Sequence, residues 1–234
     1  YNKTPISEED MQKLVEIAKD YNRVKNYVYQ RYSGIRSLPK LYPGYTIQNE
    51  MTKSGLRAEL GLPSVYFYLA VFDALGDIKN QWAQVRNRIS KCIRENQSLT
   101  AQDRHYLRFV IKQSECFENI LLGKRQILSE NWEKPYWEAC MDVDTERLDK
   151  YLCRLVRRYL NKELHTDVAN GFSVSERAYR YGDHGIYIAV KEKRKRIFIP
   201  LTDHNGYKKQ LYIRLFPEEG NIIIHVPVEV QVKS

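Results

Sequence analysis

The spacing of apolar residues changes near residue 165, and this change most constrains how the chain can fold. Before it, apolar residues recur at the three- and four-residue intervals of amphipathic helices. After it, short β-branched and aromatic runs alternate with polar residues between turn residues. The pattern predicts an α+β fold, in which a lobe of long helices precedes a small antiparallel β-barrel or curled sheet. We expect two domains: a helical lobe over residues 1–140, and a basic helix with the β-rich part over residues 141–234.

Capping residues and helix breakers set the bounds of the expected elements. Thr100 and Asp103 have the spacing of a capping box, and Gly61 and Pro63 separate a short helical piece from a long helix. The expected helices cover residues 7–32, 47–60, 64–95, 100–127 and 145–164. The turn sequences 182–183, 203–206 and 217–220 separate the expected strands. These strands cover residues 177–181, 186–190, 196–200, 209–215 and 221–231.

The overall composition is that of a folded, basic protein. Lys and Arg number 38 against 29 Asp and Glu, which gives a net charge of +9 and a sequence pI near 9.2. An excess of this size favours a polyanionic partner. No apolar run approaches the roughly 18 residues needed to cross a membrane, so we expect no membrane partner.

The cysteines indicate reduced thiols. Cys92, Cys116, Cys140 and Cys153 form no C-x-x-C pair, and no histidine lies at metal-ligand spacing from them. We therefore expect a protein of the cytoplasm without metal or other cofactor.

The helix expected at 145–164 carries the strongest local charge pattern. Its cations fall on one arc of the helix, beside an arc of apolar residues that would face a core. Arginine dominates this set, and its guanidinium forks onto phosphate oxygens. A solvated basic face remains the alternative. The predicted nucleic-acid-binding residues of this helix are Arg147, Lys150, Arg154, Arg157, Arg158 and Lys162.

Three further groups of cations extend the predicted nucleic-acid interface. An expected hairpin tip carries Lys191, Lys193, Arg194, Lys195 and Arg196, although a solubilising turn would have the same composition. The long helix carries Lys79 and Arg86 beside Trp82, which can stack on a base or fill a core. The loop after the first helix contributes Lys53 and Arg57.

Known catalytic motifs are absent from the sequence. There is no phosphate-binding glycine loop, no H-E-x-x-H, no G-x-S-x-G and no deaminase zinc motif. We therefore expect no catalytic residues and no metal site, so that this chain is not an enzyme. An active site assembled from scattered residues remains an alternative.

The order of these segments resembles the N-terminal half of TnpB. The matching features are the long first helix, the Gly/Pro linker, the stretch Ala74 to Trp82 in a long helix, and the basic β-rich unit. TnpB is the RNA-guided nuclease of insertion-sequence transposons and is similar to compact type V CRISPR effectors. In that family a helical recognition lobe is inserted into a wedge-like β-barrel. The final run, Asn221 to Val232, looks like the strand before the first catalytic aspartate of a RuvC-like domain.

The resemblance implies a function and two partners. The chain would hold a guide RNA and the guide–target DNA heteroduplex, with base pairing reading sequence and protein reading backbone shape. The catalytic carboxylates and zinc ribbon of the family are missing, so the resemblance carries no nuclease activity to this chain; its full-length parent would be the metal-dependent DNA endonuclease. The alternative function is a nuclease-free regulatory or protein-interaction unit that uses a tyrosine-rich helical surface.

Overall fold

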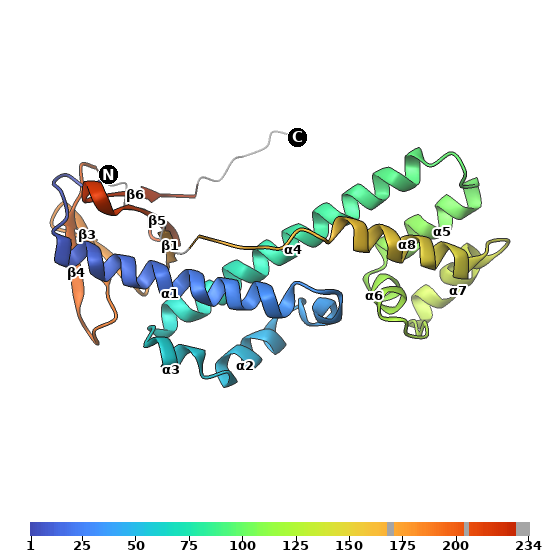
Figure 1. The fold of residues 1–234 in the computed structure, drawn as a ribbon, viewed down its shortest axis with the longest axis horizontal. Helices are drawn as coiled ribbons and strands as arrows, with labels where there is room; N and C mark the ends of the chain where they lie inside the picture. Colours follow the sequence, from blue (N-terminus) through green and yellow to red (C-terminus); the bar gives the residue numbers. More distant parts are fainter. Residues whose placement is uncertain (168–170, 204–205, 228–234) are drawn as a thin grey trace. The chain divides into compact units, whose positions relative to one another are not determined.

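A computed structural model describes residues 1–167, 171–203 and 206–227 of the chain (Figure 1). Helices occupy the N-terminal part and strands the C-terminal part, which confirms the predicted α+β class. The turn residues His204 and Asn205, and the end of the predicted last strand after Pro227, lie outside the described residues.

The helices match the predicted ones at most of their starts. The capping box at Thr100 is present, with the Thr100 side chain accepting from the Asp103 N–H at 3.0 Å and the Asp103 carboxylate accepting from the Thr100 N–H at 3.1 Å. The helices are α1 (Glu8–Tyr32), η1 (Ile35–Lys40), α2 (Tyr45–Lys53), α3 (Leu56–Leu60), α4 (Ser64–Glu95), α5 (Ala101–Lys112), α6 (Ser114–Leu122), α7 (Glu130–Cys140) and α8 (Thr145–Tyr159), with a further turn, η2 (Pro217–Glu219).

Several predicted helix bounds were wrong. The piece at 47–60 is interrupted at Gly55, which has a φ of +77° that only glycine adopts easily. The helix at 100–127 breaks at Gln113, whose extended backbone ends α5 and starts α6. The last helix ends at Tyr159 rather than at residue 164, and α7 was not predicted.

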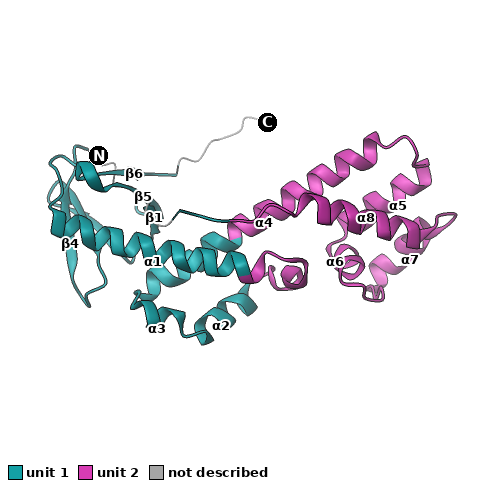
Figure 2. Cartoon of the chain, in the orientation of Figure 1, with its two compact units in different colours: residues 1–30, 44–75, 165–234 teal, residues 31–43, 76–164 magenta. Residues whose placement is uncertain are grey.

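The chain groups into two compact units, each built from separated segments (Figure 2). Unit 1 comprises Tyr1–Gln30, Gly44–Leu75 and His165–Ser234, and unit 2 comprises Arg31–Pro43 and Gly76–Leu164. The units differ from the predicted domains 1–140 and 141–234. The reason is that α4 contributes its first part to unit 1 and the rest to unit 2, while α8 packs with the other helices of unit 2.

The described strands form two three-stranded antiparallel sheets. One has the order β1-β5-β6 and the other β2-β3-β4. We expected a small antiparallel β-barrel or a curled sheet, and the described strands form two separate small antiparallel sheets. β1 was not predicted. The strands are β1 (Gly171–Val174), β2 (Tyr179–Gly182), β3 (Gly185–Ala189), β4 (Arg196–Pro200), β5 (Leu211–Phe216) and β6 (Asn221–His225).

The N-terminal residues connect the two sheets. Asn2 forms a bridge with Leu201 just after β4, and Lys3 donates its N–H to Pro200 at 2.8 Å. The Asn2 side chain also accepts from the Ile222 N–H of β6 at 3.0 Å and donates to the Gly220 carbonyl at 3.1 Å. The Asn2 side chain therefore bonds the start of β6, while the Asn2 backbone pairs with the residue that follows β4.

The core of unit 1 forms where α1, α4 and β1 meet. Phe172 of β1 is fully buried, with Tyr66 of α4 edge-on at 5.5 Å and Tyr21 of α1 at 6.4 Å between ring centroids. The Asp73 carboxylate of α4 accepts hydrogen bonds from the Tyr21 hydroxyl and from the Ser173 hydroxyl of β1. Burial raises the pKa of Tyr21 well above its ordinary value, so its phenol is a donor at neutral pH.

Replacing Phe172 with alanine should destabilise the chain severely. The substitution removes a ring that joins three elements and leaves a cavity, which typically lowers the free energy of unfolding by about 3–5 kcal/mol. Urea denaturation followed by circular dichroism measures the change. The control is Phe72→Ala, at a residue of α4 that is 43% exposed; this change should cost less than about 1 kcal/mol. Equal losses in the two variants would show that Phe172 does not organise the core.

Candidate nucleic-acid interface

Helix α8 is amphipathic in the way its sequence predicts. Asp144 caps it by accepting the Arg147 N–H at 3.0 Å, and its apolar face is buried at Leu148, Leu152, Leu155 and Val156. The opposite arc is exposed and carries Arg147, Lys150, Arg154, Arg157 and Arg158. Lys162 lies beyond the end of the helix, where its carbonyl accepts from the Gln81 side chain at 2.6 Å. The predicted basic face is therefore present within unit 2.

Two of these cations already have carboxylate partners. The Arg147 guanidinium lies 3.0 Å from the buried carboxylate of Asp103, and Lys150 lies 2.5 Å from Glu146 one turn away. The Arg147 pair links α8 to the capping box of α5, so this arginine holds helices together. Arg154 and Arg157 form no ion pair within the part of the chain that the structure describes.

An open cleft of about 600 Å³ lies between α8 and the segment that follows α6. Gly123 ends α6 with a φ of +63°, and the Gln126 side chain fixes the following segment by bonding the Cys116 carbonyl at 3.0 Å. This turn brings Lys124 to the cleft. The sequence analysis missed this cation because it placed residue 124 inside one continuous helix, 100–127, with no turn after Gly123. The cations lining the cleft are Lys124, Lys150, Arg154 and Arg157.

The two carboxylates in the cleft do not cancel this charge. Glu146 is bound to Lys150. Asp149 accepts a hydrogen bond from the Tyr106 hydroxyl at 2.7 Å, and burial raises the pKa of Asp149 above its usual value. The four cations that line the cleft outnumber its two carboxylates, so the cleft keeps an excess of positive charge.

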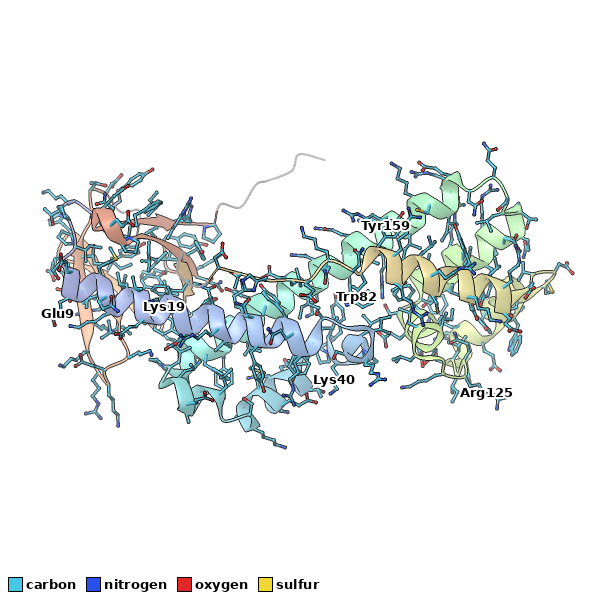
Figure 3. All side chains as sticks on the ribbon, viewed as in Figure 1. Glu9, Lys19, Lys40, Trp82, Arg125 and Tyr159 are labelled. Carbon is cyan, nitrogen blue, oxygen red and sulfur yellow. The ribbon has the colours of Figure 1, made fainter. Side chains whose placement is uncertain are left out.

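The far end of α8 is tied to α4 through Tyr159 (Figure 3). Its hydroxyl lies 3.0 Å from the Cys92 thiol, and this hydrogen bond is the main reason that the pKa of Tyr159 is raised. Arg88 and Arg158 act on the same phenol in the opposite direction. The Arg158 guanidinium lies over the Tyr159 ring, 5.7 Å from its centroid.

The predicted site residues on α4 are mostly structural. Trp82 is only 3% exposed and packs edge-on against Phe117 at 6.3 Å between ring centroids. Its ring therefore fills the core of unit 2 and presents little surface on which a base could stack. Arg86 is half-buried over the Phe117 ring, and burial lowers its pKa. Lys79 lies over the ring of Tyr42 at 4.4 Å.

The predicted hairpin tip is also partly structural. The Lys191 ammonium binds the buried Asp20 carboxylate of α1 and donates to the Leu60 carbonyl at 3.0 Å. Lys195 pairs with Glu192 within the turn. Lys193 and Arg194 are exposed, and Arg194 takes the left-handed turn conformation with a φ of +63°. Arg196 starts β4 and donates to the Arg177 carbonyl at 3.3 Å.

The predicted site residues divide between the two units. Lys53 at the end of α2 and Arg57 in α3 are exposed and belong to unit 1 with the hairpin, whereas the residues of α4 and α8 belong to unit 2. The structure brings together Lys150, Arg154 and Arg157 of the predicted set in one cleft.

Comparisons with protein-family models, with curated proteins and with solved structures found no match to this chain. Within residues 1–167, 171–203 and 206–227, no helix is long and apolar enough to cross a membrane. Over the same ranges no cluster of His, Cys, Asp and Glu side chains could hold a metal ion. All four cysteines are free thiols, and burial raises the pKa of the Cys116 thiol to about 11.

Replacing Asp103 with asparagine should change how stability depends on pH. Burial alone would raise the pKa of Asp103, but bonds from the Thr100 N–H and the Arg147 guanidinium outweigh it and hold the pKa below its ordinary value. A carboxyl whose pKa is lower in the folded state than in the unfolded state makes its full contribution to stability above about pH 4, the unfolded-state pKa. This contribution is lost as the pH falls through the folded-state pKa. Asp103→Asn should therefore be less stable than wild type near neutral pH, with the difference shrinking toward about pH 3.

Urea denaturation at these two pH values tests this expectation. Asp142→Asn is the matched control, because Asp142 is exposed just after α7 and asparagine tolerates its left-handed backbone. A stability difference that stays constant between the two pH values would contradict the assigned role of the Asp103–Arg147 pair.

Proposed function

We propose that this chain is the nucleic-acid-binding module of a TnpB-like RNA-guided nuclease. In this role it holds a guide RNA and the guide–target DNA heteroduplex, in a prokaryotic cytosol, and carries out no catalytic step itself. The observation that carries the proposal is the cleft of unit 2, where Arg154, Arg157 and Lys124 lie together. The cations that line this cleft outnumber its carboxylates, one of which is bound to Lys150. Such a set suits a phosphate backbone, because guanidinium groups bind phosphate oxygens in a bidentate manner.

The contrast among the cations of α8 supports this assignment. Cations that only keep a protein soluble can lie on any exposed helix face. Here Arg154 and Arg157 line a concave surface together with Lys124, which comes from the segment after α6. Backbone contacts of this kind grip nucleic acid without reading its sequence. Sequence would then be read by pairing between guide and target.

The chain topology also supports the proposal. Residues 76–164 of unit 2 lie in the sequence between two segments of the sheet-bearing unit 1. Insertion of a helical part into a β-rich part is the arrangement that the resemblance to TnpB implies.

Exchanging Arg154 and Arg157 for glutamate should weaken RNA binding. Each lost phosphate contact reduces the number of counterions released, so the double variant should bind at least about tenfold more weakly at low salt. The slope of log affinity against log salt should also become shallower by about 1.5. Fluorescence anisotropy with a labelled hairpin RNA at several salt concentrations measures both quantities.

The control for this experiment carries the same change in charge at other sites. Lys19→Glu/Lys134→Glu alters exposed lysines on α1 and α7, of which Lys19 is labelled in Figure 3. We expect this variant to keep most of the affinity. Equal weakening in both double variants would mean that net charge alone attracts RNA, and absence of wild-type binding at low salt would refute the proposal.

A second candidate function is a protein-interaction unit, favoured by an exposed aromatic patch on α7. Trp137 is 62% exposed and lines a pocket with the exposed Ile127, and Trp132, five residues earlier on the helix, is 42% exposed. The helix carries Glu130, Glu133 and Glu138 against a single Lys134, so cations do not dominate the patch. The prominent rings are tryptophans rather than the tyrosines of the sequence-based alternative. Exposed apolar patches of this kind mark protein interaction sites.

Replacing Trp132 and Trp137 with serine tests this second function. Neither ring is fully buried, so the variant should fold, and it should lose a protein that wild-type chain retains from a cell extract, as measured by quantitative mass spectrometry. RNA affinity should stay unchanged. Identical sets of retained proteins would contradict this function.

A further inference from the structure

One face of the β2-β3-β4 sheet is packed and the other presents a row of stacked side chains. Strand residues alternate between faces, and the buried set consists of Tyr179, Ile186, Ile188, Ile197 and Ile199. The strand register places Arg180 opposite Tyr187 and Tyr187 opposite Phe198. These three side chains therefore form one row across all three strands on the face away from the core.

The three side chains are layered on one another. The Arg180 guanidinium lies 4.4 Å from the centroid of the Tyr187 ring, and the Tyr187 and Phe198 rings are 4.8 Å apart and inclined by 41°. Cation–π and offset ring contacts of this kind fix the orientation of each group. Phe198 ends the row and is 38% exposed. A large apolar ring is thus held in place with part of its surface in water.

Gly185 allows the Phe198 ring to lie against the sheet. A Cβ atom at Gly185 would come within 2.5 Å of Cε2 of the ring, closer than side chains tolerate. The glycine therefore leaves the space over β3 that Phe198 occupies. The ring leans over the neighbouring strand instead of projecting freely, which gives the sheet a fixed aromatic surface.

Positive charge surrounds this surface. Arg196 precedes Phe198 by two residues on β4, so the two side chains share the exposed face. The adjoining hairpin tip adds the exposed Lys193 and Arg194, whereas its acidic residue Glu192 is bound to Lys195. The Asp183 carboxylate, in the turn between β2 and β3, accepts a hydrogen bond from the Tyr187 hydroxyl at 2.5 Å.

We propose that the row Arg180, Tyr187 and Phe198 is a stacking platform for unpaired bases of single-stranded nucleic acid. A base would stack on the exposed Phe198 ring, and Arg196 with the hairpin-tip cations would contact the flanking phosphates. Base–aromatic stacking accepts every base, so the platform needs no sequence-reading groups. The inference rests on the proposed function and deepens it, because it adds a site in unit 1 for unpaired segments to the phosphate-binding cleft of unit 2.

Two substitutions of Phe198 test the platform. Phe198→Ala removes the ring and should weaken binding of a twelve-nucleotide single strand by about 5- to 100-fold. Phe198→Tyr keeps a ring and should restore most of the affinity. Fluorescence anisotropy with labelled oligo-uridine and oligo-thymidine gives the affinities for RNA and DNA strands, and circular dichroism verifies that each variant folds. Phe72→Ala is the matched control, a similarly exposed phenylalanine on a helix.

Two further probes separate stacking from other roles of the ring. An abasic single strand keeps the phosphates, so Phe198→Ala should bind it as well as wild type does. A twelve-pair duplex hides its base faces and should also be insensitive to the change. Equal weakening on all three probes, or none on the single strand, would overturn the platform.

These outcomes also distinguish the platform from the proposed function. Wild type that binds duplex but not single strand would refute the platform and leave the cleft of unit 2 untouched. Wild type that binds neither probe at low salt would refute both. Arg154→Glu/Arg157→Glu should weaken binding of the abasic probe, which Phe198→Ala should not.

Discussion

The junction around the Asp73 carboxylate organises unit 1, because it joins helix α1 and strand β1 to helix α4. Tyr21 and Ser173 both donate to Oδ2 of this carboxylate, and Phe172 packs against the rings of Tyr21 and Tyr66. The two donors come from different elements, α1 and β1, and meet at one oxygen of α4. The bonds therefore specify one arrangement of the three elements, while apolar packing around Phe172 supplies the driving force. Both sheets depend on it, since β5 and β6 pair outward from β1 and the Tyr66 hydroxyl bonds the Ala189 carbonyl at the end of β3.

The elements that sequence predicted well are those whose local signals agree with their packing. Helix α8 has a cap, a continuous apolar arc and a charged arc, and the capping box at Thr100 needs only neighbours in sequence. The failures have tertiary causes. Gln113 is no usual helix breaker, and α7 continues through Pro135, which ordinarily ends a helix. The two compact units differ from the division predicted at residue 140 because α4 belongs partly to each unit, which the linear order of residues does not show.

The candidate interface shows which properties of a basic residue a sequence leaves open. Charge patterning located the exposed basic face of α8, yet it could not separate cations that hold the fold together from cations without a carboxylate partner. Lys191 and Arg147 each pair with a carboxylate that is almost fully buried. Removing either cation would leave a buried charge with neither a partner nor water, which is destabilising. Trp82 was harder still, because the sequence pattern of a tryptophan near a lysine is the same whether the ring is buried in a core or exposed for stacking on a base. The row ending in Phe198 depends on strand register, which appears only when the strands are paired.

The interleaving of the two units dictates the order in which the chain can fold during synthesis. Unit 2 needs only residues up to Leu164, including the early segment Arg31–Pro43, whose helix η1 packs on α6. Unit 1 begins earlier in the chain, but it cannot be completed until β1 and the later strands have been made. Phe172 of β1 then packs against Tyr21 of α1 and Tyr66 of α4. While these strands are still in the ribosome, the apolar faces of both helices have no native cover. Unit 2 can thus be complete before unit 1, whose segments flank it in the sequence. A fragment of residues 76–164 alone would lack η1, the helix that packs on α6.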